Sequence, residues 1–203
     1  MVEITVDSES RAAHTCFSIA TNCQGLAHLA SEKWEIEHHC TTGIIFVAFS
    51  IEAMINHFGK IMFKDKWEAK RTNRKEQHRI FFKSVNLPSY LGTENYQIAN
   101  KCFEIRDNFA HGKTKDETLK VTISDDISHE DLVRQVVYSP TSMESLATIE
   151  NLDKYIEIAH NIEDDIQEHG YYPGQDHIPK EEREKLLECP LNVTGIRTFL
   201  IVS

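Results

Sequence analysis

The chain has 203 residues, of which 40% are hydrophobic and 27% charged, values that suit a single globular domain. Its net charge of −10 argues against broad, non-specific binding to nucleic acid, although residues 60–79 concentrate eight Lys and Arg against three Asp and Glu. The sequence has no run of ~18 uninterrupted apolar residues, no signal-like N-terminus and no closely paired cysteines, so we expect a cytoplasmic protein with reduced thiols and no membrane contact.

The first 63 residues have the apolar spacing of two helices. The spacing predicts one helix over residues 8–38, capped by Asp7 or Ser8, and a second over 38–63. Apolar residues of the second helix cover nearly its whole circumference between Ile44 and Ile55. Such a helix is expected at the centre of a bundle.

Two more helices are predicted before residue 113. The basic stretch 66–83 favours a third helix, in which Trp67 is one of the apolar contacts. A fourth opens at Thr93 or Asn95 and runs to about His111, where Gly112 provides a typical helix stop. Its apolar stripe consists of Ile98, Cys102, Ile105 and Phe109.

The second half of the chain mixes strand and helix patterns. Residues 118–124 alternate with the period of a strand and 132–139 are rich in β-branched residues, so they are expected to pair as a hairpin. Residues 141–170 predict a long amphipathic helix, and 194–202 a last strand.

These patterns predict a mainly α protein, an antiparallel four- to five-helix bundle with a small β element in its C-terminal half. Residues 1–170 would form the bundle, with the hairpin inserted at about 117–139. Residues 171–203 would add a loop, a short helix and a strand.

The sequence gives no sign of a metal or a common cofactor. His38-His39-Cys40 and the pair Cys16 and Cys23 lack the spacing of a structural zinc site. Gly-rich phosphate loops, dinucleotide fingerprints and serine-hydrolase elbows are absent. We therefore expect no metal and no cofactor.

The basic stretch 60–79 has two interpretations. It is a solvated helix face, or it is a surface that follows a phosphate backbone. In the second case Arg71 and Arg74 would contact phosphate and Trp67 could stack on a base.

The stretch "RDNFAH", residues 106–111, also has two interpretations. In the structural one it is an ion-paired helix end: His111 interacts with the helix dipole, Asp107 pairs with it four residues away, and Arg106 binds a carboxylate from another helix. Both readings leave Gly112 as the helix stop.

In the functional interpretation the same groups cleave RNA. A histidine can take a proton from a ribose 2′-hydroxyl or return one to the leaving oxygen, and an arginine stabilises the phosphorane oxygens. Asp107 would orient the His111 imidazole, and Asn108 could donate to phosphate. Such a site needs no metal and leaves a 2′,3′-cyclic phosphate. Five residues correspond to ~140° around a helix, so Arg106 and His111 diverge within one chain, and a two-fold dimer would bring them together.

The motif Arg106-Asp107-Asn108-Phe109-Ala110-His111, late in a helix of an α-bundle, resembles the signature of the HEPN superfamily (higher eukaryotes and prokaryotes nucleotide-binding). The segment "AFSIEAMINHFGKIMF", residues 48–63, is similar to the family's earlier core helix, which often contains a Glu and an Asn. The resemblance covers roughly residues 8–113 and the long helix 141–169. One departure is Ala110, where the toxin subgroup has tyrosine.

The resemblance implies a metal-independent endoribonuclease that acts as a homodimer on RNA, in toxin–antitoxin, phage-defence or RNA-processing settings. Arg106 and His111 would be the catalytic pair, with Asp107 as the polar position between them; Asn108, Lys113, Arg71 and Arg74 would contact RNA phosphates. A cognate antitoxin or a nucleotidyltransferase is the implied partner. The alternative is a non-catalytic HEPN bundle that binds a partner protein or a nucleotide.

Overall fold

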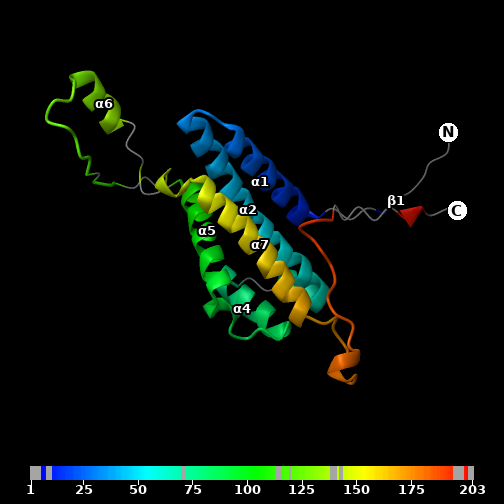
Figure 1. Ribbon diagram of the computed structural model, residues 1–203. Helices are drawn as coiled ribbons and strands as arrows, with labels where there is room; N and C mark the ends of the chain where they lie inside the picture. The colour runs from blue at the N-terminus through cyan, green and yellow to red at the C-terminus, as the bar shows by residue number, and fades with distance from the viewer. Residues whose placement is uncertain are drawn as a thin grey trace.

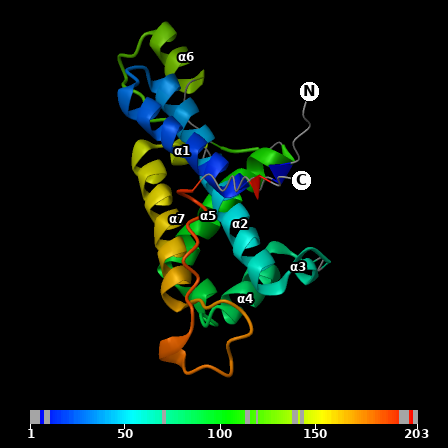
Figure 2. The same cartoon turned by 90° about the vertical axis from the view of Figure 1, so that its right-hand side faces the viewer.

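The computed structural model describes residues 6–7, 11–69, 72–112, 116–118, 120–137, 141, 144–193 and 199–200. Four long helices run alternately up and down the molecule (Figure 1). They are α1 (Ala12–Leu29), α2 (Lys33–Phe63), α5 (Glu94–His111) and α7 (Ile149–His169). The short helices α3 (Asp65–Ala69) and α4 (Arg74–Ser84) lie together at one end of the bundle (Figure 2). The prediction of a mainly helical bundle is confirmed.

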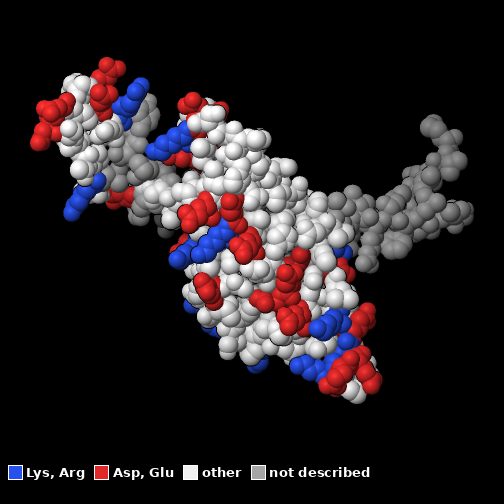
Figure 3. Space-filling view, viewed as in Figure 1, with Lys and Arg blue, Asp and Glu red and all other residues white. Residues whose placement is uncertain are grey.

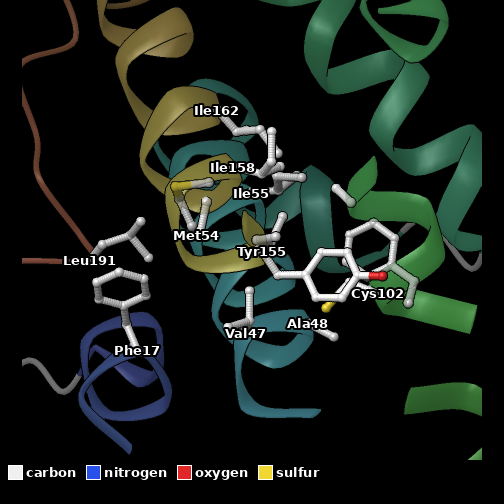
Figure 4. Close-up of a cluster of buried hydrophobic side chains, with 14 of the residues drawn as sticks. Phe17, Val47, Ala48, Met54, Ile55, Cys102, Tyr155, Ile158, Ile162 and Leu191 are labelled. Atoms are coloured by element: carbon white, nitrogen blue, oxygen red, sulfur yellow. The ribbon is translucent and has the colours of Figure 1, made fainter. Parts of the chain in front are cut away.

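Helix α2 is the central element, as its apolar circumference predicts. It packs against α1, α5 and α7, and Ile44, Met54 and Phe58 are fully buried. Figure 4 shows the core that results, with side chains from α1, α2, α5 and α7 converging and Leu191 of the C-terminal segment beside Phe17. Among the described residues α2 is also the one helix long and apolar enough to cross a membrane. Its packing inside the bundle accounts for that composition.

Three predicted helix boundaries are wrong. The long helix predicted over 141–170 begins at Ile149, because Thr148 caps it by accepting a hydrogen bond from the backbone N–H of Asn151 (3.2 Å). The first break in the chain falls at Ala30–Glu32 rather than at residue 38, so Trp34 belongs to α2 and is 65% exposed. The basic helix predicted over 66–83 is two helices, because Asn73 caps α4 by accepting a hydrogen bond from the backbone N–H of Glu76 (2.9 Å).

The predicted hairpin at 117–139 is also wrong. Residues 129–137 form helix α6 (His129–Val137), and the described residues of 118–124 have no regular secondary structure. Ser128 Oγ accepts from the backbone N–H of Asp131 (3.1 Å), and Leu132, Val133 and Val136 then fall on one helix face. Capping and spacing therefore outweigh the β-branched composition of this segment.

The C-terminal segment returns along the bundle after Gly170. Glu163 of α7, itself 2% exposed, accepts from the backbone N–H of Leu191 (3.0 Å), and Glu188 binds Arg11 Nη2 at 2.6 Å. The short helix expected here is a single 3₁₀ turn, Lys180–Glu182. Of the strand predicted at 194–202, Phe199–Leu200 pairs with Val6–Asp7, a two-residue ladder too short to be the expected β element, and the rest lies outside the described residues.

Candidate functional site

The RDNFAH motif occupies the last two turns of α5. Thr93 caps the start of this helix, its Oγ1 accepting from the backbone N–H of Tyr96 (3.3 Å). Gly112, at a φ of 54°, ends it in the left-handed conformation. Both ends of α5 thus lie where the sequence predicts them.

Arg106 is fixed by a carboxylate on α2. Its Nη1 donates to Glu52 Oε2 (2.8 Å) and its Nη2 to Glu52 Oε1 (2.7 Å), a two-pronged pair that sets the plane of the guanidinium. The Arg106 side chain is 11% exposed, and its Cζ lies 5.0 Å from the centre of the Phe49 ring. The arginine is therefore held on two sides by α2.

Asp107 binds two arginines. Its Oδ2 accepts from Arg74 Nη1 of α4 (2.8 Å), and its Oδ1 lies 2.9 Å from Arg106 Nε. Arg74 also approaches Glu52 Oε1 (3.4 Å) and lies over the Phe103 ring. Together Glu52, Arg74, Arg106 and Asp107 form a network across α2, α4 and α5, called here the arginine–carboxylate cluster.

The cluster balances two positive against two negative side chains. Burial lowers the pKa of the Arg106 guanidinium, but the hydrogen bonds and charge of Glu52, followed by the charge of Asp107, outweigh it and raise the pKa above its ordinary value. Arg106 is thus a permanent cation. A guanidinium has five N–H donors. Nη1 and Nη2 each donate one hydrogen bond to Glu52, which leaves one N–H on each for another acceptor, while the buried Nε contacts Asp107 as an ion pair.

His111 lies outside this cluster. It is exposed, and within the described part of the chain its ring has no hydrogen-bond partner. The predicted pairing of Asp107 with His111 is wrong, because both oxygens of Asp107 are directed to the arginines. Arg106 turns toward α2 while His111 stays in solvent, as the ~140° separation along the helix predicts.

The flank of His111 is exposed as well. Asn108 is exposed, and Phe109, predicted to belong to the apolar stripe of α5, is 41% exposed. Phe49, beneath Arg106, is 37% exposed. The end of the motif therefore presents aromatic as well as polar surface.

The other residues predicted to contact RNA have different outcomes in the structure. Arg74 belongs to the cluster, whereas Arg71 and Lys113 lie outside the described residues. Base stacking on Trp67 is wrong, because that ring is 4% exposed, packs on Gly59 and Phe63, and donates to Asn56 Oδ1 (3.0 Å). The basic stretch therefore offers its exposed lysines and not an aromatic platform.

The chemistry of the motif alone does not predict Glu52 as a site residue. A signal for it exists in the sequence, since a lone carboxylate in the apolar window 43–55 requires a cationic partner once the helix is buried. Arg106 and Arg74 provide that partner. Nothing in the sequence pairs Arg74 with Asp107, because that contact depends on how α4 turns back at Asn73.

Among the described residues, no three His, Cys, Asp or Glu side chains gather in a way that could hold a metal ion. Comparison of the chain with protein-family models, with curated proteins and with solved structures gives no match.

Proposed function

We propose that this protein is a HEPN-type endoribonuclease that acts as a homodimer and cleaves RNA without a metal ion. His111 would be the proton-transfer group, Arg106 the group that stabilises the transition state, and RNA the substrate. Glu52 and Asp107 would fix the position of Arg106.

The observation that supports the proposal is the position of His111. The structural interpretation of the motif explains Arg106 and Asp107, which are ion-paired, but it explains His111 only through a pair with Asp107 that does not form. An exposed imidazole remains at the end of a helix, five residues after a rigidly held arginine. Proton transfer to and from RNA is the chemistry that this combination fits.

The reaction balances with these groups. The imidazole of His111 takes the proton of a ribose 2′-hydroxyl, the 2′-oxygen attacks phosphorus, and the bond from phosphorus to the 5′-oxygen breaks. The leaving 5′-oxygen receives a proton from the imidazolium of a second His111. The two free N–H donors of Arg106 bind the phosphorane oxygens. The products are a 2′,3′-cyclic phosphate and a 5′-hydroxyl.

The dimer follows from the divergence of the two side chains. One chain presents Arg106 against α2 and His111 in solvent, so a shared cleft needs a second α5 end. Phe109 and Phe49, both partly exposed beside the motif, offer apolar surface for that contact.

The test is a cleavage assay on single-stranded RNA in EDTA, with end-group analysis of the products. We expect cyclic phosphate and 5′-hydroxyl ends, and a loss of at least about 100-fold for Arg106→Ala and for His111→Ala. His169→Ala is the matched control, because His169 is also an exposed last residue of a helix followed by glycine. It should cleave like the wild type.

Three results would overturn the proposal: cleavage that persists in both variants, activity that EDTA removes, or products with 3′-hydroxyl ends. Folding of each variant is checked by circular dichroism. His111 is exposed, so His111→Ala should unfold at the same temperature as the wild type.

A second function is favoured by the charge balance of the cluster. Glu52 and Asp107 already compensate Arg106 and Arg74, which weakens their attraction for phosphate. A non-catalytic bundle that binds a partner protein or nucleotide fits this balance. It predicts no cleavage by the wild type and binding of a nucleotide or protein that His111→Ala leaves intact.

A further inference from the structure

A cross-bonded loop follows α7 and is called here the Gln175 loop, residues 170–186. Its ends are closed, because the backbone N–H of Leu186 donates to the carbonyl of Gly170 (3.0 Å). The Gln175 side chain donates to the carbonyls of Tyr172 (3.0 Å) and Glu184 (3.1 Å) and accepts from the backbone N–H of Glu184 (2.7 Å). Figures 1 and 2 show the loop in orange, at the same end of the molecule as α4. Compact surface loops with closed ends are frequently functional.

The Gln175 loop encloses a cavity of about 210 Å³ against the ends of α2 and α4, called here the loop cavity. This volume is below the ~300–1,000 Å³ of pockets for drug-sized ligands, and it suits a single small ring system. The lining includes Met62, Ser84 and Asn86 from the bundle side and Tyr171, Tyr172 and Arg183 from the loop. Aromatic rings beside amide and guanidinium groups are the surroundings in which proteins hold an unstacked nucleobase.

Two polar side chains of the loop cavity keep hydrogen-bonding capacity for a ligand. Arg183 donates from Nε to the Ile178 carbonyl (2.9 Å) and from Nη2 to the Asp176 carbonyl (3.3 Å), so its guanidinium is fixed while Nη1 has no partner among the described residues. Asn86 donates from Nδ2 to the His169 carbonyl (3.1 Å), and within the described chain its Oδ1 accepts no hydrogen bond. Guanidinium and amide groups of this kind pair with the edges of bases.

A wider hollow of about 640 Å³ continues the loop cavity toward α3. It shares Pro173 and Gly174 with the cavity and is bordered by Lys64 and Lys66, both exposed. Together the two linings contain three basic and two acidic side chains, in a chain whose net charge is −10. Figure 3 shows Lys and Arg beside acidic side chains at this end of the molecule. A site for single-stranded nucleic acid combines aromatic rings with nearby cations in this way.

Unusual backbone conformations gather at the same place. Lys64 (φ 52°) and Asn86 (φ 62°) are the two non-glycine residues with positive φ in the described part of the chain, and Gly174 has a φ of 85°. Asn86 lines the loop cavity, Lys64 the wider hollow, and Gly174 both. Strained residues of this kind cluster at sites that hold ligands.

The loop cavity lies along the same central helix as the arginine–carboxylate cluster. Met62 follows Glu52 by ten residues, about 15 Å along the axis of α2. Figure 1 places the Gln175 loop at the end of the bundle opposite the end of α5, so a dimer that joins two α5 ends leaves the cavity open.

We propose that the loop cavity binds one unpaired base of a single-stranded RNA, with the neighbouring phosphates beside Lys64 and Lys66. Tyr171 and Tyr172 contact the faces of the base, and Arg183 and Asn86 contact its edge. The site holds the substrate and takes no part in cleavage. RNA is the ligand because of the proposed function, on which this proposal rests, but binding is measured without cleavage.

The experiment measures RNA binding in EDTA by the full-length His111→Ala protein, the parent, which keeps the cavity and lacks the proton-transfer group of the proposed active site. The probe is a fluorescein-labelled single-stranded RNA of about 20 nucleotides, which at ~3.4 Å per nucleotide exceeds the ~46 Å length of α2. Fluorescence anisotropy gives the Kd over a range of salt concentrations. A gel confirms that the RNA stays intact.

The first variant, Tyr171→Ala, removes a ring from the cavity. We expect binding that is about 5- to 100-fold weaker with an unchanged salt dependence, because stacking on a base involves no charge. Tyr171→Phe keeps the ring and should bind like the parent. His177→Ala is the matched control, since His177 is an exposed ring of the same loop outside the cavity lining.

The second variant, Lys64→Gln/Lys66→Gln, removes two cations from the wider hollow. We expect the slope of log Kd against log salt to fall by about 1.4, since each phosphate contact with a single strand contributes ~0.7. Lys101→Gln/Lys154→Gln is the charge control, because both lysines are exposed on other parts of the bundle. It should bind with the slope of the parent.

A crosslinking measurement needs no variant of the loop. RNA that contains 4-thiouridine is irradiated in complex with the parent, and mass spectrometry identifies the peptide that carries the RNA. We expect the peptide with Tyr171 and Tyr172. Crosslinks confined to other peptides, equal affinity of Tyr171→Ala and the parent, or no binding of RNA would each overturn the proposal.

The outcomes for the loop cavity and for the ribonuclease are distinct. Cleavage by the wild type, with RNA binding that Tyr171→Ala leaves unchanged, would overturn the cavity and support the nuclease. RNA binding that Tyr171→Ala weakens, without cleavage by the wild type, would overturn the nuclease and support the cavity.

Discussion

Arg106 and Glu52 are joined by two hydrogen bonds, Nη1 to Oε2 at 2.8 Å and Nη2 to Oε1 at 2.7 Å, although 54 residues separate them. The pair ties the end of α5 to the middle of α2, and both side chains are largely buried. It thus links the motif to the core helix of the bundle.

This pair should contribute measurably to stability. Glu52→Gln keeps the shape of the side chain but leaves the Arg106 charge without its main partner, so we expect a loss of about 1–3 kcal/mol in the free energy of unfolding. Urea unfolding of Glu52→Gln, Arg106→Gln and the double variant gives the coupling energy. A coupling below ~0.5 kcal/mol would contradict the arrangement seen here.

Two glycines in helices should respond in opposite directions to alanine. A Cβ at Gly59 would lie 2.3 Å from the Trp67 ring, so Gly59→Ala should destabilise the protein by about 1–3 kcal/mol. A Cβ at Gly25, which is exposed within α1, meets nothing within 4 Å, and Gly25→Ala should stabilise by about 0.5–1 kcal/mol. Thermal unfolding measures both changes. Equal shifts would mean that Trp67 does not pack on Gly59.

His78 should make the fold sensitive to acid. The ring is 3% exposed and lies 2.9 Å from the hydroxyl of Tyr96; burial, and then the charge of Arg74, lowers its pKa to about 3. An unfolded histidine titrates near pH ~6.5, so between these values the unfolded chain binds one proton more than the folded chain. Stability should therefore fall as the pH falls, by up to ~1.4 kcal/mol per pH unit.

Urea unfolding at pH 7, 6, 5 and 4 checks this, with His78→Gln as the comparison. The variant should be less stable at pH 7 but should lose stability more slowly on acidification. The charges of Arg11 and His57 outweigh the effect of burial and lower the pKa of Glu188. This carboxylate also makes the fold sensitive to acid, but it does so equally in the wild type and in His78→Gln. Parallel slopes would contradict a buried neutral His78.

The two tryptophans should be distinguishable by fluorescence. Trp34 is 65% exposed and Trp67 is 4% exposed. Trp67→Phe should leave an emission spectrum typical of a solvated indole and strongly quenched by iodide, whereas Trp34→Phe should leave a blue-shifted, protected emission. The reverse pattern would contradict the exposed position of Trp34 and the buried position of Trp67.

The sequence predicts the helices that bury a wide apolar surface. It does not predict the helix boundaries that depend on a single local contact. The circumference of α2 and the glycine after α5 carry strong signals, and both predictions agree with the structure. The break before α4 depends on one side-chain cap at Asn73, which the basic composition conceals. Helix α6 was missed because its valines favour strands, although their spacing is helical.

Within the RDNFAH motif, too, some features can be predicted from the sequence and others cannot. Its place at a helix end and the divergence of Arg106 from His111 follow from helical geometry and can be predicted. The partner of Asp107 cannot, because an aspartate four residues before a histidine suggests a local pair, while the competing arginine comes from α4.

The segment 116–137, which carries α6, connects two parts of the bundle that pack against each other. Helices α1, α2, α4 and α5 precede it and α7 follows it, yet α7 packs against α1, α2 and α5. A protease that cuts the exposed residues 120–126 should thus yield two fragments that remain one folded particle and separate only in denaturant. We therefore expect the two parts to reassemble when they are expressed apart.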